Sequence, residues 1–249
     1  GAPSIYNGVE QTDGQGGPDA GGYRWIDSDE PGGPTFNWFE ISGIGTQITT
    51  WTNGTGDDGS ANVTLPFNFS YYGTNYSQLK ICTNGWVSFD VASTNSAYTN
   101  TAIPAVAEPN NALLPFWDDL DVRTSGGIFY YYDAPNSRFV VQYNNVPHFS
   151  SGGPYTFQVF LYNTGKIVYQ YLNMVTLLNS ATIGNENQTG STGLQMVFNN
   201  TYVHNNLAIK IEKGIEWVDE TPALGTILPS SNQNVNVTFN STGLSVGSY

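Results

Sequence analysis

Apolar and polar residues alternate along much of the chain, with the period of two that marks a half-buried β-strand. The clearest case is residues 62–69, where Val63, Leu65, Phe67 and Phe69 occupy every second position. No window of useful length shows the i, i+3, i+4, i+7 spacing of an amphipathic helix. The pattern therefore predicts an all-β protein.

The predicted strands are short and are separated by turns rich in Gly, Asn, Thr and Ser. They comprise one through Phe36, Trp38, Phe39 and Ile41, and then 47–51, 63–69, 78–82, 85–89, 128–132, 139–143, 156–162, 167–171, 181–183, 194–198, 207–211 and 235–239. The clearest hairpin joins 156–162 to 167–171 through Asn163-Thr164-Gly165. This spacing is typical of a mainly antiparallel, jelly-roll-like β-sandwich.

Composition divides the chain into three segments. Residues 1–22 are Gly-rich with few core-forming side chains, which predicts an extended N-terminal arm, and residues 23–213 form the predicted sandwich. Residues 214–249 hold two expected strands, too few to bury a core of their own. We expect this C-terminal segment to pack on the main domain, to belong to a cut-off module, or to complete its sheet with another chain.

Charge is scarce and one-sided. Charged residues make up 11% of the chain, and 7 Lys and Arg stand against 20 Asp and Glu, which gives a net charge of -13. So few cations argue against nucleic acid or an anionic membrane as a partner. No apolar stretch approaches the roughly 20 residues of a membrane span. The chain opens at Gly-Ala-Pro without Met, which fits a processed or excised chain, and we expect an extracellular or cell-surface location.

Catalytic residues are not expected. His148 and His204 lie in separate turn-rich segments, and the chain has no G-x-S-x-G elbow. Two distant His and the single Cys82 are too few for a zinc site. A glycosidase needs two carboxylates at a defined distance from each other, and the positions of acidic residues in the sequence do not give that distance. The sequence therefore predicts a protein that is not an enzyme.

Two acidic clusters are the candidates for metal binding. They crowd carboxylates into strand ends or turns, as calcium sites do. The candidate ligands are Asp27, Asp29, Asp118, Asp119 and Asp121. Neither cluster matches the twelve-residue EF-hand loop. We expect no cofactor other than calcium, which these two clusters could bind.

Eight Asn-x-Ser/Thr sequons are candidate glycosylation sites. They are Asn53, Asn62, Asn68, Asn75, Asn187, Asn199, Asn236 and Asn240. In strand 62–69 the alternation places Asn62 and Asn68 on the solvent face, and Asn236 and Asn240 alternate with apolar residues in the same way. The alternative is a polar strand face without sugar.

Several motifs together carry a resemblance to a known family. They are Leu65-Pro66-Phe67, Thr83-Asn84-Gly85-Trp86-Val87-Ser88-Phe89, Leu114-Pro115-Phe116-Trp117-Asp118-Asp119-Leu120, Gly127-Ile128-Phe129-Tyr130-Tyr131 and Thr156-Phe157-Gln158-Val159-Phe160-Leu161. In this order they resemble the extracellular nidogen-type (NIDO-like) β-domain and β-sandwich modules of large secreted bacterial proteins. The resemblance implies packing roles, with Asp118 or Asp119 tying loop backbone beneath Trp117, and it brings no catalytic residues.

The C-terminal segment resembles the first half of a BACON-type bacterial Ig-like repeat, on Trp217, Pro229, Val235–Phe239 and Gly243. The second half of that pattern is absent. We therefore expect a structural module, a subunit of a cell-surface filament or stalk that assembles with copies of itself by strand exchange and carries N-glycans. The alternative is a glycan-binding or adhesive accessory module of a larger secreted enzyme, with cell-surface glycans as its partners. Exposed aromatic rings could stack on sugars, but no residue marks a site.

Overall fold

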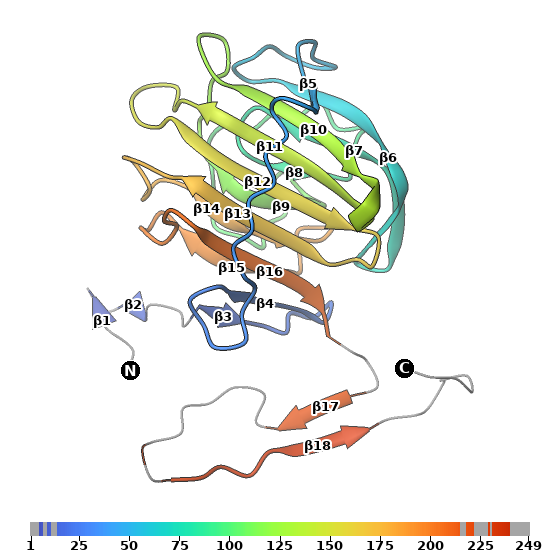
Figure 1. Ribbon diagram of the computed structural model, residues 1–249, viewed down its shortest axis with the longest axis vertical. Helices are drawn as coiled ribbons and strands as arrows, with labels where there is room; N and C mark the ends of the chain where they lie inside the picture. Colours follow the sequence, from blue (N-terminus) through green and yellow to red (C-terminus); the bar gives the residue numbers. More distant parts are fainter. Residues whose placement is uncertain are drawn as a thin grey trace.

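Two antiparallel β-sheets pack face to face and form the body of the molecule (Figure 1). The structure is a computed structural model that describes residues 5–6, 9–10, 14–214, 218–221, 229 and 231–239. All strand pairs between these residues are antiparallel, and the only helix among them is a single 3-10 turn, η1 (Ala134–Asn136). The predicted all-β, mainly antiparallel sandwich is confirmed.

The strands follow one another closely along the chain. They are β1 (Ile5–Tyr6), β2 (Val9–Glu10), β3 (Gln15–Gly16), β4 (Tyr23–Asp27), β5 (Thr46–Gln47), β6 (Ser60–Tyr71), β7 (Thr74–Cys82), β8 (Val87–Ser88), β9 (Ala112–Trp117), β10 (Gly127–Asp133), β11 (Arg138–Val146), β12 (Tyr155–Tyr162), β13 (Ile167–Asn173), β14 (Thr182–Glu186), β15 (Gly193–Phe198), β16 (Leu207–Lys213), β17 (Val218–Thr221) and β18 (Asn236–Phe239).

The larger sheet has eight strands in the order β3-β4-β16-β13-β12-β11-β10-β5, and the smaller has six in the order β15-β14-β9-β8-β7-β6. The predicted hairpin is β12–β13, with Leu161 opposite Ile167. Strand β9 was not among the predicted strands, because its six residues are all buried and show no alternation. In the N-terminal region, β3 pairs with the chain's own β4.

Tyrosine hydroxyl groups cross the core between the two sheets. Tyr143, Tyr169 and Tyr171 of the larger sheet are fully buried. Their hydroxyls donate to backbone carbonyls of the smaller sheet: Tyr169 to Gly184 O at 2.9 Å and Tyr171 to Pro115 O at 2.6 Å. The ladder between β14 and β9 is irregular between Thr182 and Gly184, which frees carbonyls from regular pairing. A buried carbonyl needs a donor, and a long side chain with a terminal O–H supplies one.

An irregular segment, residues 34–45, crosses the outer face of the larger sheet (Figure 1). Three glutamines from neighbouring strands bond its backbone. Gln170 both accepts from and donates to the Asn37 backbone, Gln158 donates to Phe39 O, and Gln142 accepts from the Ile41 N–H. The predicted strand through residues 36–41 is therefore wrong, because side chains of the sheet satisfy this backbone and no strand partner is needed.

A second irregular segment, residues 90–111, covers the outer face of the smaller sheet. A small apolar cluster lies beneath it, formed by Cys82, Trp86, Ile103, Ala112, Leu114 and Trp117. Cys82 is fully buried, and burial raises the pKa of its thiol to about 12. A thiol with a pKa raised in this way stays protonated at neutral pH and is therefore a poor nucleophile.

The C-terminal strands β17 and β18 pair with each other and with no other described strand. Figure 1 shows this pair apart from the two large sheets. No helix in the described part of the chain is long and apolar enough to cross a membrane.

Candidate functional site

The Asn84-Gly85 turn draws two acidic loops together at one end of the sandwich. The Asn84 side chain is fully buried; its amide donates to Asp58 Oδ1 at 2.9 Å and its oxygen accepts from the Leu120 N–H at 2.9 Å. Gly85 has φ +74°, and a Cβ there would lie 1.9 Å from Phe116 O. Only glycine fits this approach, so the turn fixes the loop before β6 against the loop after β9.

Three carboxylates meet at this point. Asp57, Asp58 and Asp119 each place an oxygen within 4.8 Å of the others. Burial raises the pKa of Asp57 and of Asp119, and neighbouring carboxylates raise both further. Asp57 Oδ1 is buried without a hydrogen-bond partner, while Arg123 lies 3.0 Å from Asp57 Oδ2. These oxygens are of the type that calcium prefers and could hold such a cation.

Of the five predicted metal ligands, only Asp119 joins this cluster. Asp118 accepts from Ser180 Oγ at 2.6 Å and from the Asp119 N–H at 3.0 Å. Asp121 binds Arg123 through both carboxylate oxygens at 2.9–3.1 Å, and these hydrogen bonds lower its pKa. Asp118 therefore joins the loop after β9 to Ser180 through side chains, and the only loop backbone group that these bonds tie is the adjacent Asp119 N–H.

Asp27 and Asp29 belong to a different group. The Tyr202 hydroxyl donates to Asp27, and burial raises the pKa of that carboxyl. Asp29 Oδ2 lies 2.9 Å from His204 Nε2. Burial alone would lower the pKa of His204, but the hydrogen bonds with Asn205 and Asp29 outweigh it and the pKa is raised. Calcium binding by any of the five residues stays a prediction.

The sequence interpretation missed Asp57 and Asp58. They lie in Gly56-Asp57-Asp58-Gly59, an oxygen-rich turn of the same kind as the clusters that were chosen. The signal was present, but nothing in the sequence shows that residues 57–58 and 119 meet. The buried Asn84 makes that connection.

The family motifs anchor the segment that covers the smaller sheet. The indole N–H groups of Trp86 and Trp117 both donate to Ala97 O, at 3.0 and 2.9 Å. Lys80, whose burial lowers its pKa, donates to the carbonyls of Ser93 and Asn95. These side chains satisfy every second carbonyl of the loop from Ser93 to Ala97.

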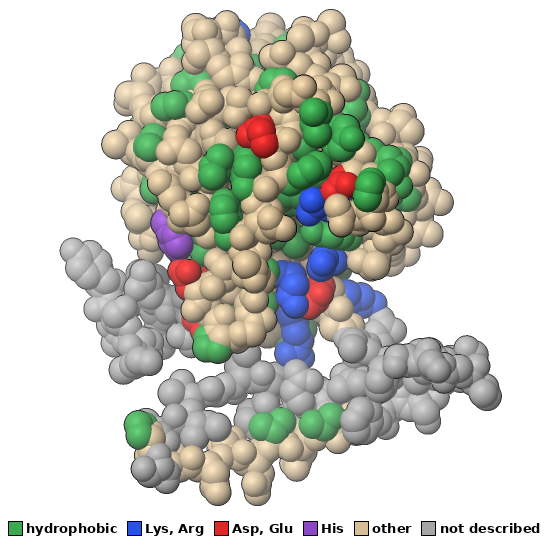
Figure 2. Space-filling view, viewed as in Figure 1, with side chains coloured by type: hydrophobic (Ala, Val, Ile, Leu, Met, Phe, Trp, Pro, Cys, Tyr) green, Lys and Arg blue, Asp and Glu red, His purple; other side chains and the backbone are tan. Residues whose placement is uncertain are grey.

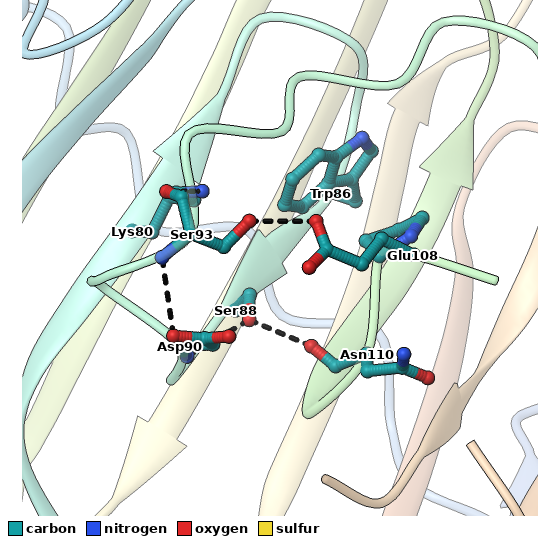
Figure 3. A pocket seen from close by; sticks show the side chains of 8 residues that line it. Lys80, Trp86, Ser88, Asp90, Ser93, Glu108 and Asn110 are labelled. Carbon is teal, nitrogen blue, oxygen red and sulfur yellow. Dashed lines mark hydrogen bonds between the residues drawn. The ribbon is translucent and has the colours of Figure 1, made fainter. Parts of the chain in front are cut away.

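Figure 3 shows a small recess beside these anchors, where Ser93 Oγ donates to Glu108 Oε2 at 2.6 Å and Ser88 Oγ donates to Asn110 O at 2.8 Å. Lys80 and Trp86 also line it. The volume of the recess is only about 10 Å³, roughly enough for one water molecule. Its polar groups serve the loop and leave no room for a ligand.

The sequons differ in accessibility. Asn68 and Asn75 are exposed on the β6–β7 hairpin, and Asn199 and Asn236 are exposed elsewhere. Asn53, Asn62 and Asn187 are half-buried. The Asn62 amide, the atom that would carry a glycan, donates to Val91 O at 3.0 Å. Asn240 lies outside the described residues.

A family model described as NIDO related matches residues 35–229, most of the chain. Searches of curated proteins and of solved structures each returned no significant match. NIDO-related domains are typically extracellular, in agreement with the expected location. A BACON-type repeat and a bacterial source have no support from these searches. On the family match, the chain belongs to the NIDO-related family.

Proposed function

We propose that this NIDO-related domain is a structural module of an extracellular filament or stalk, and that its C-terminal strands join it to a neighbouring copy. The observation that carries the proposal is the exposure of Val235 and Val237, which are 52% and 51% accessible. They stand two residues apart and so lie on one face of an extended segment.

The two-stranded pair of β17 and β18 is not expected to be stable by itself. An isolated two-stranded hairpin is marginally stable in water, and it gains stability from a third strand or an apolar surface to pack on. No third strand pairs with β17 or β18 among the described residues. Strand addition from a second copy supplies main-chain hydrogen bonds and covers the two valines.

The rest of the described surface fits a structural role. The edges of the larger sheet are two-residue strands, β3 and β5. β6, a long edge strand of the smaller sheet, carries an irregularity between Thr64 and Phe69 that contains Pro66. Short edges, bulges and proline are devices that prevent uncontrolled strand pairing. Three of the four edges of the large sheets are thus poor sites for strand addition, which favours the C-terminal hairpin.

A charge-insertion experiment tests the proposal. The double variant Val235→Asp/Val237→Asp should remove self-association of the full chain, because two carboxylates cannot be buried at the contact. Gln233→Glu/Asn234→Asp adds the same two charges at exposed polar positions and should leave association unchanged. Sedimentation velocity over a concentration series gives the mass. A wild type that stays monomeric throughout, or equal association of both variants, would refute the proposal.

A further inference from the structure

A pocket opens at the end of the sandwich where both sheets meet the β12–β13 turn. Its volume is about 310 Å³, at the lower limit of typical small-ligand sites. Ser70 at the end of β6 lines one side, Thr164 and Lys166 of the turn line another, and Glu212 and Lys213 of β16 complete it. Gly165 at the turn leaves space beside Ser70 O, since even a Cβ there would lie 3.8 Å away.

This end of the molecule holds most of the chain's positive charge. Of the seven Lys and Arg residues, Lys166 and Lys213 line this pocket, and Arg24 and Lys210 line the next one, which shares Glu212 with it. Figure 2 shows Lys and Arg side chains gathered along the lower edge of the sandwich. In a chain of net charge -13, such a concentration creates a local attraction for an anion.

Lys166 is held in place by its own turn. Its ammonium group lies 3.9 Å from the centre of the Tyr162 ring, a cation–π contact that fixes the side chain. The Tyr162 N–H donates to Lys166 O at 2.9 Å and closes the turn. Within the described part of the chain, no carboxylate lies within 4.0 Å of Lys166. Lys166 thus lines the pocket with an ammonium that no carboxylate neutralises.

Uncharged donors and acceptors surround this cation. The hydroxyls of Ser70 and Thr164 have no hydrogen-bond partner among the described residues. Glu212 pairs with Lys210 and keeps acceptor capacity, because a carboxylate can accept about four hydrogen bonds. The pocket therefore offers the ammonium of Lys166, two hydroxyls and a carboxylate within a small volume.

From these groups we infer that the pocket binds a single sugar residue that carries a carboxylate, a uronic acid. The sugar carboxylate would pair with Lys166, and its ring hydroxyls would bond Ser70, Thr164 and Glu212. A long polyanion is disfavoured because the remaining surface is strongly acidic. This binding is independent of assembly through the C-terminal hairpin.

Matched sugar pairs test the inference. Methyl glucuronide is compared with methyl glucoside, and methyl galacturonide with methyl galactoside. Each is titrated at millimolar concentration into the full chain, with ¹H–¹⁵N spectra as the readout. The uronides should shift the amides of Ser70 and Thr164, and the neutral glycosides should bind at least about tenfold more weakly, since a charge-assisted hydrogen bond is lost.

Lys166→Gln should weaken uronide binding by about tenfold or more. Arg123→Gln, which removes one positive charge in the loop after β9 and outside both of these pockets, should leave binding nearly unchanged. Thermal melting confirms that both variants fold, and Thr164→Val gives a second, milder loss if Lys166→Gln does not fold. The inference would be overturned if neither uronide bound, if a uronide and its neutral glycoside bound equally, or if Lys166→Gln and Arg123→Gln lost binding equally.

Discussion

Trp86 and Trp117, from different segments of the smaller sheet, donate to the same acceptor, the carbonyl oxygen of Ala97. One loop carbonyl with two lone pairs thereby fixes the segment that covers this sheet. Both tryptophans belong to the family motifs, which explains those motifs as anchors of loop backbone.

This shared acceptor predicts a coupling between the two tryptophans. Trp86→Phe or Trp117→Phe leaves Ala97 O with one donor, so each should cost about 1–3 kcal/mol, chiefly through lost packing. The double variant leaves the carbonyl without either donor and should exceed the sum of the two by about 1 kcal/mol. Urea unfolding measures the free energies. Trp51→Phe, at a half-buried tryptophan packed against the main core, serves as the uncoupled control. Strict additivity of the Trp86 and Trp117 substitutions would argue against a shared anchor.

Two aspartates of the loop after β9, Asp119 and Asp121, are expected to have opposite effects on stability. The pKa of Asp119 is raised, so its contribution to stability is present below its unfolded pKa and is lost as pH rises through the folded pKa. Asp119→Asn should therefore stabilise the metal-free protein at pH 7 by roughly 0.5 kcal/mol. Asp121→Asn should destabilise it, because Asp121 is held ionised by Arg123. Melting temperatures in chelator give the signs, and a loss of stability in Asp119→Asn would contradict the assignment.

Local pattern was enough to predict most strands but not what covers them. Alternation in residues 156–171 depends on neighbours a few positions apart, so the β12–β13 hairpin could be read directly. Residues 36–41 also carry spaced aromatics and were predicted as a strand. Their backbone partners are glutamine side chains more than 100 positions away, and no local rule reports such contacts.

The candidate site shows the same limit. Asp118, Asp119 and Asp121 could be picked out because acidic residues crowd one short stretch. Their different environments could not be predicted, since Asp119 lies beside Asp57 and Asp58, which belong to a loop about 60 positions earlier in the chain. The predicted ligands were selected by composition, whereas the actual grouping is set by Asn84 and by the approach of two loops.

Glu186 predicts a pH dependence of stability near neutrality. Its side chain is fully buried, its Oε2 accepts from the Ala105 N–H at 3.0 Å, and its Oε1 has no partner. Burial raises its pKa to about 7. The contribution of Glu186 to the free energy of unfolding is thus fully present below about pH 4.5 and is lost as the pH rises through about 7.

Glu186→Gln keeps an acceptor for Ala105 and removes the charge. It should be more stable than the wild type at pH 8, by up to about 3 kcal/mol, and the difference should fall toward zero near pH 5. Unfolding in urea across pH 5–8 measures both curves, with Glu108→Gln as an exposed-carboxylate control. Parallel curves for wild type and Glu186→Gln would exclude this role.

Glycan attachment, if the chain is expressed in a glycosylating host, should follow amide accessibility. Asn68 and Asn75 are exposed and are expected to be modified most completely. Asn62 should stay unmodified on the folded chain, because its amide is hydrogen-bonded to Val91 O. Peptide mass spectrometry gives the occupancy of each sequon, and full modification of Asn62 with bare Asn68 and Asn75 would reverse the expected order.

Hydrogen–deuterium exchange at increasing protein concentration tests the proposed strand exchange most directly. If β18 pairs with a neighbouring copy, amides of Asn236–Phe239 should become more protected as concentration rises. Amides of β12, already paired with β11 and β13, should exchange at the same rate throughout. Protection in residues 236–239 that does not change with concentration would contradict assembly through the C-terminal hairpin.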